Sequence, residues 1–569
     1  PEEPTISFFP HEVNQPNLKV LKTRKKAVVT LDIGSFCARE TILVSPDNTV
    51  FQSQQLRSLT PYRCTYGYDV LVFVGYGLFV HCLSEQQIIE LLSDRNITIS
   101  QREIGFLGKK FIAYLAIAHR QAQQRLNQLM SHKGGYILHI DGTCEGGSPH
   151  LFTGMDGIAQ IVLDNIKLPS EKAKSIVPFL EKIKKQYGNP IALVHDMGKG
   201  ILSAVEAVFK GIPDFICHFH FLRDIGKDLY EAEYAKIRTR LTKHKIRTIL
   251  RAKPKALASL IEEDTQVGTG LLKSISKNQP NIIPAEKLAI VSSYVMIHWA
   301  LDTTGQLEGY GFPFDCPHFI FYQRLKVLYE MVDIAGYDQF DKRFFNLWKP
   351  LNKIINDQQL KSSARQIEKK METFKQLRKA LSITVSENKK GLNDDGDDDT
   401  NIKSIAQKVK QFRTQIMADE KLSQANSYKK MIKQIDTYWD KLFADPIIIE
   451  TSDGQVVIHP QRTNNILERF FRELKRRNRK RSGSISLNRR LKTMLTDTPL
   501  IKNLDNKEYI EAILDGNDTL EERFEKIDSN MVIEKLKAEQ KSYGKISPEM
   551  KKIIQRPDLP EELTALFAA

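Results

Sequence analysis

The sequence is poor in cysteine and has none of the close cysteine pairs that build local metal sites. Its six cysteines are scattered over 569 residues, and no two of them form a CxxC pair. Such spacing is typical of a reducing compartment and excludes a standard zinc finger made from local ligand pairs. We therefore expect an intracellular protein.

Long apolar runs are missing as well. No run approaches the roughly 20 residues of a membrane span. The start of the chain, Pro1-Glu-Glu-Pro4, has no signal-peptide pattern. The sequence shows no internal repeat. We expect no membrane partner.

Positive charge, in contrast, is in excess. The chain has 84 Lys and Arg residues against 69 Asp and Glu, which gives a net charge of +15. A basic protein favours a polyanionic partner, and nucleic acid is the leading candidate. A chain of this length also exceeds what one hydrophobic core supports, so we expect several domains.

Two apolar stretches each end in an aspartate. Tyr136-Ile-Leu-His-Ile-Asp141 suits a buried strand and is followed by a glycine, and Ile191-Ala-Leu-Val-His-Asp196 repeats the pattern. Burial strongly penalises a lone charge, so acids on core strands usually lie at an edge where a cation or a reactant compensates them. We predict that Asp141 and Asp196 hold divalent metal ions, together with the distant Glu468.

The first part of the chain is predicted to contain an arm and a small domain. Residues 1–26 are polar and end in the basic run Lys22-Thr-Arg-Lys-Lys26, which indicates a flexible basic arm. Residues 27–82 have short β-type runs at 27–33 and 70–74, separated by turn residues. These runs predict a small β-rich accessory domain.

Two helix starts follow each other closely in residues 83–133. Ser84 caps one predicted helix, and the capping box Ser100-Gln-Arg-Glu103 opens a longer one that runs to about Met130. The short turn between them gives a helix-turn-helix-like pattern, whose second helix would enter a major groove. An α-hairpin packed beside the core is an equally good interpretation. In the first interpretation the DNA contacts are Arg102, Lys109 and Lys110.

Residues 134–225 alternate between strand and helix patterns. Strands are expected at 136–141, 151–163, 165–168, 191–196 and 214–219, with helices at 169–187 and 202–209. The order of three strands, helix, strand, helix and strand is that of a ribonuclease-H-like core. In that order the first and fourth strands end side by side, which brings Asp141 and Asp196 together.

The rest of the chain is mostly helical. Residues 226–455 form a large, mostly α-helical insertion, in which the acidic run Asn393–Asp399 is predicted to be a solvated loop. Residues 456–499 return to the core with a helix from about Thr463, and residues 500–569 form a C-terminal helical region. The expected fold is therefore an α/β ribonuclease-H-like core interrupted by a helical insertion, with β-rich and helix-turn-helix-like regions before it.

The helix after Thr463 carries an acid at the edge of an apolar stripe. At 100° per residue Glu468 lies on the flank of that stripe, one turn after Asn464, so it could reach into a cleft. An ion pair with Arg472 at i+4 is the alternative for Glu468. The stripe consists of Leu467, Phe470, Phe471 and Leu474.

Basic residues are dense on the same helix. Eight of the thirteen residues from Arg469 to Arg481 are Lys or Arg. Such density is self-repelling unless a polyanion neutralises it, so we predict a DNA-contacting helix; a solvated basic tail is the alternative. The predicted contacts are Arg472, Lys475, Arg476, Arg477, Arg479, Lys480 and Arg481.

Four motifs together resemble a known family. They are Asp141-Gly-Thr143, His195-Asp196, Cys217-His-Phe-His220 and Asn464-Asn-Ile-Leu-Glu468. In this order they resemble the DDE transposases of the ribonuclease-H-like superfamily, and the nearest branch is the Mutator-like and hAT-like one with a C-x2-H motif. The resemblance implies that Asp141, Asp196 and Glu468 are the catalytic triad, with Cys217, His220 and Asn464 as supporting residues of the core.

A metal requirement follows from the triad. Three carboxylates converge only if cations screen their repulsion, and hard oxygen ligands suit Mg²⁺ or Mn²⁺. Two ions per active site would serve in-line attack on a phosphodiester by water or by a 3′-hydroxyl. Cys217 and His220 also match two ligands of a zinc site, although a packing and hydrogen-bonding role is the alternative that we favour.

The resemblance also implies partners. The expected partners are double-stranded DNA, as transposon ends and target, and a second copy of the chain in a homodimer or larger homo-oligomer. Trp299 in the insertion resembles an aromatic residue that stacks on a base, with a core tryptophan as the alternative. The expected compartment is the cytoplasm of a prokaryote, at its nucleoid, or the nucleus of a eukaryote.

The predicted function is therefore that of a DNA transposase that cleaves and joins strands. Two alternatives stay open: a structure-specific nuclease of the same fold, and a domesticated DNA-binding protein without catalysis.

Overall fold

The computed structural model shows a mixed α/β protein. It describes residues 4–10, 17–262, 266–279, 282–336, 342–383, 402–443, 445–451, 454–458, 464–541 and 548–568. The chain divides into two compact units, one of Pro1–Cys217 with Pro446–Ala569 and one of His218–Asp445. The predicted acidic loop 393–399 and the predicted helix start at Thr463 lie outside the described residues. In the described ranges no helix has both the length and the apolarity that crossing a bilayer requires.

A five-stranded sheet forms the centre of the first unit. Its order is β7-β6-β5-β8-β9, in which β5, β6 and β7 are antiparallel while β8 and β9 run parallel to β5. The three strands expected first are present as an antiparallel meander, but the run 151–163, expected to be one strand, contains nearly all of β6 and the start of β7. The strands are β5 (Ile137–Thr143), β6 (His150–Asp156), β7 (Val162–Leu168), β8 (Ala192–His195) and β9 (Asp214–Ile216).

Two helices connect the parallel strands. They are α6 (Ala173–Tyr187) and α7 (Lys199–Val208), close to the predicted bounds. The prediction of a strand through Phe219 is wrong, because β9 ends at Ile216 and α8 (His218–Lys243) begins two residues later. The alternating His and Phe residues after Cys217 suggested a strand, but they lie in the first turn of α8.

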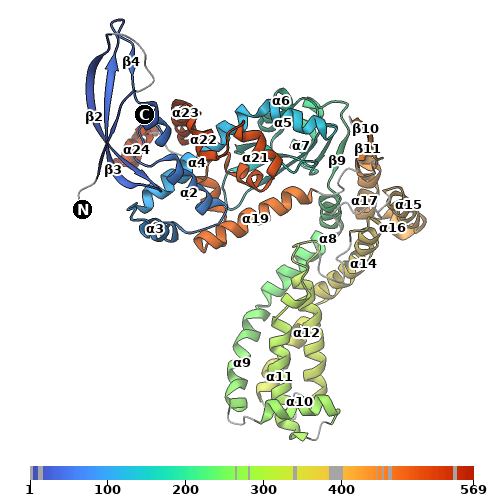
Figure 1. Cartoon of the computed structure of the whole chain (residues 1–569). Helices are drawn as coiled ribbons and strands as arrows, with labels where there is room; N and C mark the ends of the chain where they lie inside the picture. The colour runs from blue at the N-terminus through green and yellow to red at the C-terminus, as the bar shows by residue number, and fades with distance from the viewer. Residues whose placement is uncertain are drawn as a thin grey trace. The chain divides into compact units, whose positions relative to one another are not determined.

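The N-terminal region differs from its prediction in two places. The basic run Lys22–Lys26, predicted to lie in a mobile arm, is part of β2 and pairs with Ala38–Ile42 of β3. The predicted strand at 70–74 is wrong, because these residues lie in α2 (Tyr68–Phe79). Apolar residues continue through this stretch, so no two-residue period separates strand from helix. The strands are β1 (Thr5–Phe8) and, labelled in Figure 1, β2 (Lys19–Thr30), β3 (Gly34–Val44) and β4 (Val50–Phe51). A short helix, α1 (Gln54–Leu59), follows them.

The two helices predicted from their caps are present. Ser84 forms the capping box of α3 (Glu85–Ser93), and Ser100 caps α4 (Gln101–Gln121) through the backbone NH of Glu103. The longer helix breaks at Ala122, and α5 (Gln123–His132) continues from there.

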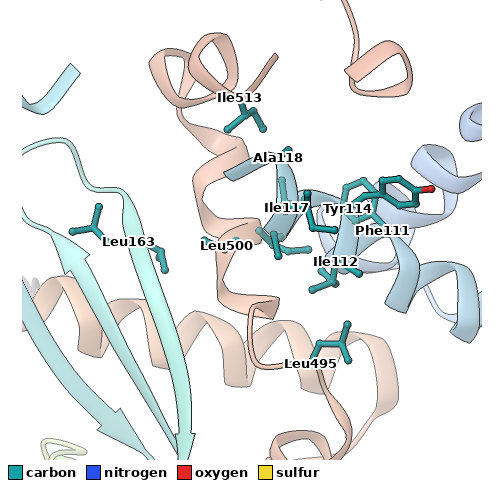
Figure 2. Close-up of a cluster of buried hydrophobic side chains, with 14 of the residues drawn as sticks. Phe111, Ile112, Tyr114, Ile117, Ala118, Leu163, Leu495, Leu500 and Ile513 are labelled. Carbon is teal, nitrogen blue, oxygen red and sulfur yellow. The ribbon is translucent and has the colours of Figure 1, made fainter. Parts of the chain in front are cut away.

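Helix α4 lies in the hydrophobic core. Its side chains meet Leu163 of β7 and apolar residues from the C-terminal part of the unit, including Leu500 and Ile513 (Figure 2). All residues from Lys110 to His119 are buried. This part of the helix is buried on every side and has no free face for a major groove, so its burial favours the packed α-hairpin, while Arg102 and Lys109 before it are exposed.

The C-terminal part of the first unit is helical, as predicted, after a β-hairpin. The side chain of Asn503 bonds the backbone of Val162 in both directions and thereby covers part of the edge strand β7. The hairpin is β10 (Ile447–Thr451) with β11 (Gly454–Ile458). The helices are α19 (Asn465–Ser482), α20 (Asn488–Thr493), the 3₁₀ helix η3 (Thr498–Asp505), α21 (Lys507–Leu514), α22 (Leu520–Glu525), α23 (Ser529–Lys541), α24 (Pro548–Ile554) and α25 (Leu559–Ala568).

The described part of the second unit consists of helices. Helix α11 lies beside both α9 and α12 (Figure 1). After α8 the helices are α9 (Ile246–Glu262), α10 (Val267–Lys277), α11 (Ala285–Leu301), η2 (Thr304–Gln306), α12 (Pro317–Ile334), α13 (Lys342–Ile355), α14 (Gln358–Ala380), α15 (Ile402–Ala418), α16 (Glu420–Gln424), α17 (Asn426–Thr437) and α18 (Trp439–Leu442).

Candidate active site

The register of β5 and β8 places two of the predicted acids side by side. The two strands are parallel, and Ile140 pairs with His195 as the last pair of the ladder. Asp141 and Asp196 are the next residue on each strand, and neighbouring strands lie about 4.8 Å apart. Asp141 is 8% exposed, and its Oδ1 accepts a hydrogen bond from the backbone NH of Gly142 (2.7 Å).

Asn464 attaches the start of α19 to β5. Its side chain is fully buried, donates from Nδ2 to the carbonyl of Ile140 (2.9 Å) and lies 3.0 Å from Nδ1 of His139 through Oδ1. Its backbone NH also donates to Sγ of Cys217 (3.3 Å). A segment more than 320 residues away in sequence is thereby fixed at the residue just before Asp141.

The face of the sheet is also determined. His139 and Asp141 are two residues apart on one strand, so their side chains leave β5 on the same face. Asn464 contacts His139 from that face. The start of α19 therefore lies on the face to which Asp141 points.

Glu468 follows Asn464 by one helical turn. Its backbone NH donates to the carbonyl of Asn464 (3.1 Å), and its side chain is 21% exposed. One turn of helix rises about 5.4 Å. The backbone of Glu468 therefore lies about one helical turn from the residue that is fixed beside Asp141. The alternative partner is present as well, because Oε2 of Glu468 lies 3.8 Å from the guanidinium of Arg472, which is 64% exposed.

The buried histidine His139 was not singled out from the sequence. It is fully buried, and this burial lowers its pKa from 6.5 to about 4, although the hydrogen bond with Asn464 raises it. The ring is therefore neutral at pH 7. Its place two residues before a strand-end aspartate was the signal that could have identified it, because this spacing puts both side chains on one face.

Buried His195 supports the loop after β8. Its Nδ1 donates to the carbonyl of Asp196 (2.8 Å), and its Nε2 lies 3.1 Å from the carboxylate of Asp214 on β9. The ring thereby ties the backbone of Asp196 to the neighbouring strand.

One group of side chains in the described residues has the spacing of a metal site. Ligand atoms of Asp196, Cys217 and His220 all lie within 4.8 Å of one another. Asp141 and Glu468 are outside this group. Cys217 and His220 come together because a helix begins at His218. A thiol and an imidazole suit zinc better than magnesium.

The predicted basic residues of α19 differ in exposure. Arg472, Lys475, Arg476, Arg479 and Lys480 are exposed. Arg477 instead donates to Glu473 (2.6 Å) and to the carbonyl of Phe79 (3.0 Å), so it holds α19 in place. Arg481 is half-buried.

The other predicted DNA contacts are also unequal. Arg102 and Lys109 are exposed on α4, but Lys110 is buried and its ammonium lies 4.9 Å from the centre of the Phe106 ring. In the second unit Trp299 is 37% exposed, with the guanidinium of Arg324 over its ring at 4.5 Å. A base could stack on that face of Trp299 only if Arg324 moved away.

Comparison with known proteins adds no family. No family model matches the chain, and no curated protein matches it.

Proposed function

We propose that this protein is a DDE-type DNA transposase, which binds the ends of a mobile element and performs metal-dependent strand cleavage and strand transfer. The observation that carries the proposal is the anchoring of Asn464 on Ile140 and His139. It brings Glu468 toward the sheet edge where the register of β5 and β8 places Asp141 and Asp196. In this proposal three acids from distant parts of the chain would act together at that edge.

The sheet order supports the proposal. An antiparallel three-strand meander followed by two parallel strands, in the order β7-β6-β5-β8-β9, is the order expected of a ribonuclease-H-like core. In such a core the carboxylates belong near the carboxyl ends of β5 and β8; Asp141 lies two residues before the end of β5, and Asp196 directly follows β8. The unit His218–Asp445 would then be the helical insertion that separates Asp196 from Glu468.

The donor set fits a hard divalent cation. Asp141, Asp196 and Glu468 offer carboxylate oxygens only, which Mg²⁺ and Mn²⁺ prefer. Bound there, two such ions would activate the attacking hydroxyl and stabilise the leaving oxygen of the phosphodiester. The protein's own part is to hold the acids on β5, β8 and α19, and to bind the DNA backbone through the exposed basic residues of α19.

Two buried residues beneath the start of α19, His139 and Asn464, help to position Glu468 in this proposal. His139 and Asn464 make no direct contribution to the reaction in this proposal. They fix the angle at which α19 leaves the sheet, because both lie fully buried and bond each other. They are positioning residues for Glu468.

A strand-transfer assay tests the proposal. The full chain is incubated with Mg²⁺, a labelled DNA carrying an element end and a supercoiled target. Joined products are expected, and Asp196→Ala should lower both cleavage and joining roughly a thousandfold, because loss of metal ligation removes several kcal/mol of transition-state stabilisation. Glu206→Ala, which removes an exposed carboxylate from α7, is the matched control and should leave both reactions unchanged.

The outcomes separate the candidates. Cleavage without joining would make the protein a nuclease of the same fold. DNA binding without either reaction would make it a non-catalytic DNA-binding protein. Activity supported by Zn²⁺ but not by Mg²⁺ or Mn²⁺ would transfer the metal role to Asp196, Cys217 and His220. Two ends must be joined, so a dimer or larger assembly on the DNA is also expected.

A further inference from the structure

A pocket in the first unit is lined by arginines and lies apart from the three acids. Parts of α2, α19, α20 and η3 surround it. The lining residues used below are Phe79, Arg477, Asn478, Arg481, Arg490 and Lys502. Of these, Arg477 and Arg481 were predicted to meet DNA.

Two guanidinium groups face one aromatic ring in this pocket. The guanidinium of Arg481 lies 5.9 Å and that of Arg490 lies 5.7 Å from the centre of the Phe79 ring. Within the described residues, neither group is within ion-pair distance of a carboxylate or donates a side-chain hydrogen bond. Glu85 is the acid whose charge acts on both, and it does so from beyond ion-pair distance.

The neighbouring Arg477 shows what a purely structural arginine looks like here. It lines the same pocket, yet its donors are used by Glu473, by the carbonyl of Phe79 and by Asp505 at 3.6 Å. Arg481 and Arg490 have the same aromatic neighbour but none of these acceptors. Stacking on Phe79 accounts for their position and leaves their donors unused.

The electrostatics of the pair are unfavourable as they stand. Burial and, to a smaller extent, the charge of Arg481 lower the pKa of Arg490 to about 9. Burial also lowers the pKa of Arg481. Two cations that share a partly desolvated pocket repel each other, and an anion between them would remove that repulsion. A phosphate oxygen set matches the forked donors of arginine.

We infer that Arg481 and Arg490, stacked on Phe79, form a binding site for a backbone phosphate of DNA. This inference rests on the proposed function for the identity of the ligand, because inorganic phosphate has the same chemistry. Lys502 and Asn478 also line the pocket, but both are already engaged: the Lys502 ammonium lies 3.3 Å from Asp505, and Nδ2 of Asn478 donates to the carbonyls of Ser484 and Ser486.

The position along α19 predicts which phosphate is held. Arg481 follows Glu468 by thirteen residues, and a helix rises 1.5 Å per residue, so the two lie about 20 Å apart along the axis. One nucleotide spans about 3.4 Å of a strand. The site would therefore bind a phosphate about six nucleotides from the one that is cleaved.

The first test uses inorganic phosphate and needs neither DNA nor catalysis. The Tm of the full chain is measured in phosphate and in chloride at matched ionic strength, for wild type, Arg490→Gln, Arg481→Gln and Arg57→Gln. Arg57 is an exposed arginine on α1 and is the matched control. Phosphate stabilises proteins in general by exclusion from their surface, and the control measures that part. If phosphate binds in the pocket, wild type and Arg57→Gln should show the same rise in Tm on changing chloride for phosphate. Arg481→Gln and Arg490→Gln should show a smaller rise, because only the general effect of phosphate remains.

The second test measures DNA binding without divalent metal. Arg490→Gln should weaken binding about tenfold and lower the slope of log K against log salt by about 0.9, one phosphate contact. Arg490→Gln should no longer weaken binding to a duplex that ends fewer than about six nucleotides from the cleavage position, because that duplex lacks the phosphate. Arg490→Lys, which keeps the charge, should restore the slope.

Each result decides the inference. An equal phosphate-induced rise in all four proteins would overturn the anion site itself. The pocket variants could lose the phosphate-induced rise in Tm and still bind DNA as wild type does. That result would overturn the assignment to DNA and leave a site for free phosphate. Because the phosphate test involves neither DNA nor cleavage, a failure of the transposase proposal would leave the anion site supported, and the reverse also holds.

Discussion

Two basic helices of the first unit, α4 and α19, were both predicted to contact DNA, and the structure gives them opposite environments. All residues of α4 from Lys110 to His119 are buried, and the predicted contacts Arg102 and Lys109 are exposed only in the part of the helix before them. Helix α19 buries an apolar stripe that includes Leu467 and Phe470, and it exposes most of its arginines. Both helices carry basic residues, so their charge does not predict which one is exposed. The width of the apolar face does, because it is wide on α4 and narrow on α19.

The width of a helix's apolar surface decides how many of its residues are left for contacts outside the core. Helix α4 has apolar residues all around its middle, as a core helix does, and α19 has one narrow stripe, as a surface helix does. The same narrow stripe lets α19 carry Glu468 toward the sheet on one side and basic residues toward solvent on the other.

The largest expected effect comes from the core helix. Phe111 on α4 is fully buried and packs against Phe524 with ring centres 5.7 Å apart. Phe111→Ala should lower the free energy of unfolding by about 3–5 kcal/mol. Phe106→Ala, on the same helix but 42% exposed, should lower it by less than about 1.5 kcal/mol. Chemical denaturation measures both values, and equal losses would contradict the assignment of α4 to the core.

The second effect concerns the buried His139 beneath the start of α19. Its pKa is about 4 in the folded protein and about 6.5 when unfolded, so its contribution to stability is complete above pH 6.5 and is lost as pH falls toward 4. The loss should reach about 3 kcal/mol. Unfolding free energies of wild type and His139→Gln, measured from pH 7 to pH 4, should converge by that amount.

A second buried group acts in the same pH window with the opposite sign. Burial raises the pKa of Asp156 to about 6, so this group favours the folded state as pH falls from 6 toward 3.8. It is present in wild type and in His139→Gln alike, so the difference between the two proteins cancels it. A difference that stays constant with pH would contradict the burial of a neutral His139.

A smaller effect is expected from the attachment of α19. Asn464→Ala removes two buried hydrogen bonds, to Ile140 and His139, and should lower the free energy of unfolding by about 1–3 kcal/mol. If Asn464 positions Glu468, kcat should fall much more than this loss of stability explains, with KM for DNA unchanged. Asn488→Ala, which removes an amide bonded to the carbonyl of Gly146, is the matched control and should leave kcat unchanged.

The smallest effect on stability separates the exposed charges of the two helices. Arg476→Gln with Arg479→Gln should change the free energy of unfolding by less than about 0.5 kcal/mol but lower the salt slope of DNA binding by about 1.8. Arg102→Gln with Lys109→Gln on α4 should leave the slope unchanged. Equal decreases in the two double variants would show that α4 also meets DNA.

Much of the helical structure could be predicted because its signals are local. The serine caps at Ser84 and Ser100 marked two helix starts correctly. The strand-end pattern at 136–141 and 191–196 also gave the correct neighbours, because a run bounded by turn residues has few alternatives.

The errors came from stretches where tertiary packing decides. Residues 70–74 are strand-like in composition but lie in α2, against which α4 packs so closely that a Cβ at Gly75 would come within 2.3 Å of the Phe111 ring. The run Lys22–Lys26 had the composition of a mobile arm, and its pairing with β3 depends on residues far along the chain. The burial of Lys110 was likewise invisible in a local pattern.

The site was partly predictable for the same reason. Asp141, Asp196 and Glu468 have local signals: two strand ends and the flank of an apolar stripe. His139 and Arg490 do not, because their roles depend on contacts with Asn464 and Phe79, which are distant in sequence.

The most direct test of the central claim is Mn²⁺ binding, measured by electron paramagnetic resonance on the full chain without DNA. The account predicts that Asp141→Asn, Asp196→Asn and Glu468→Gln each weaken Mn²⁺ binding at least tenfold. Glu473→Gln, on the same helix but paired with Arg477, should bind Mn²⁺ like wild type. If Glu468→Gln binds Mn²⁺ as tightly as Glu473→Gln does, then Glu468 does not share a metal site with the two aspartates, and the account is contradicted.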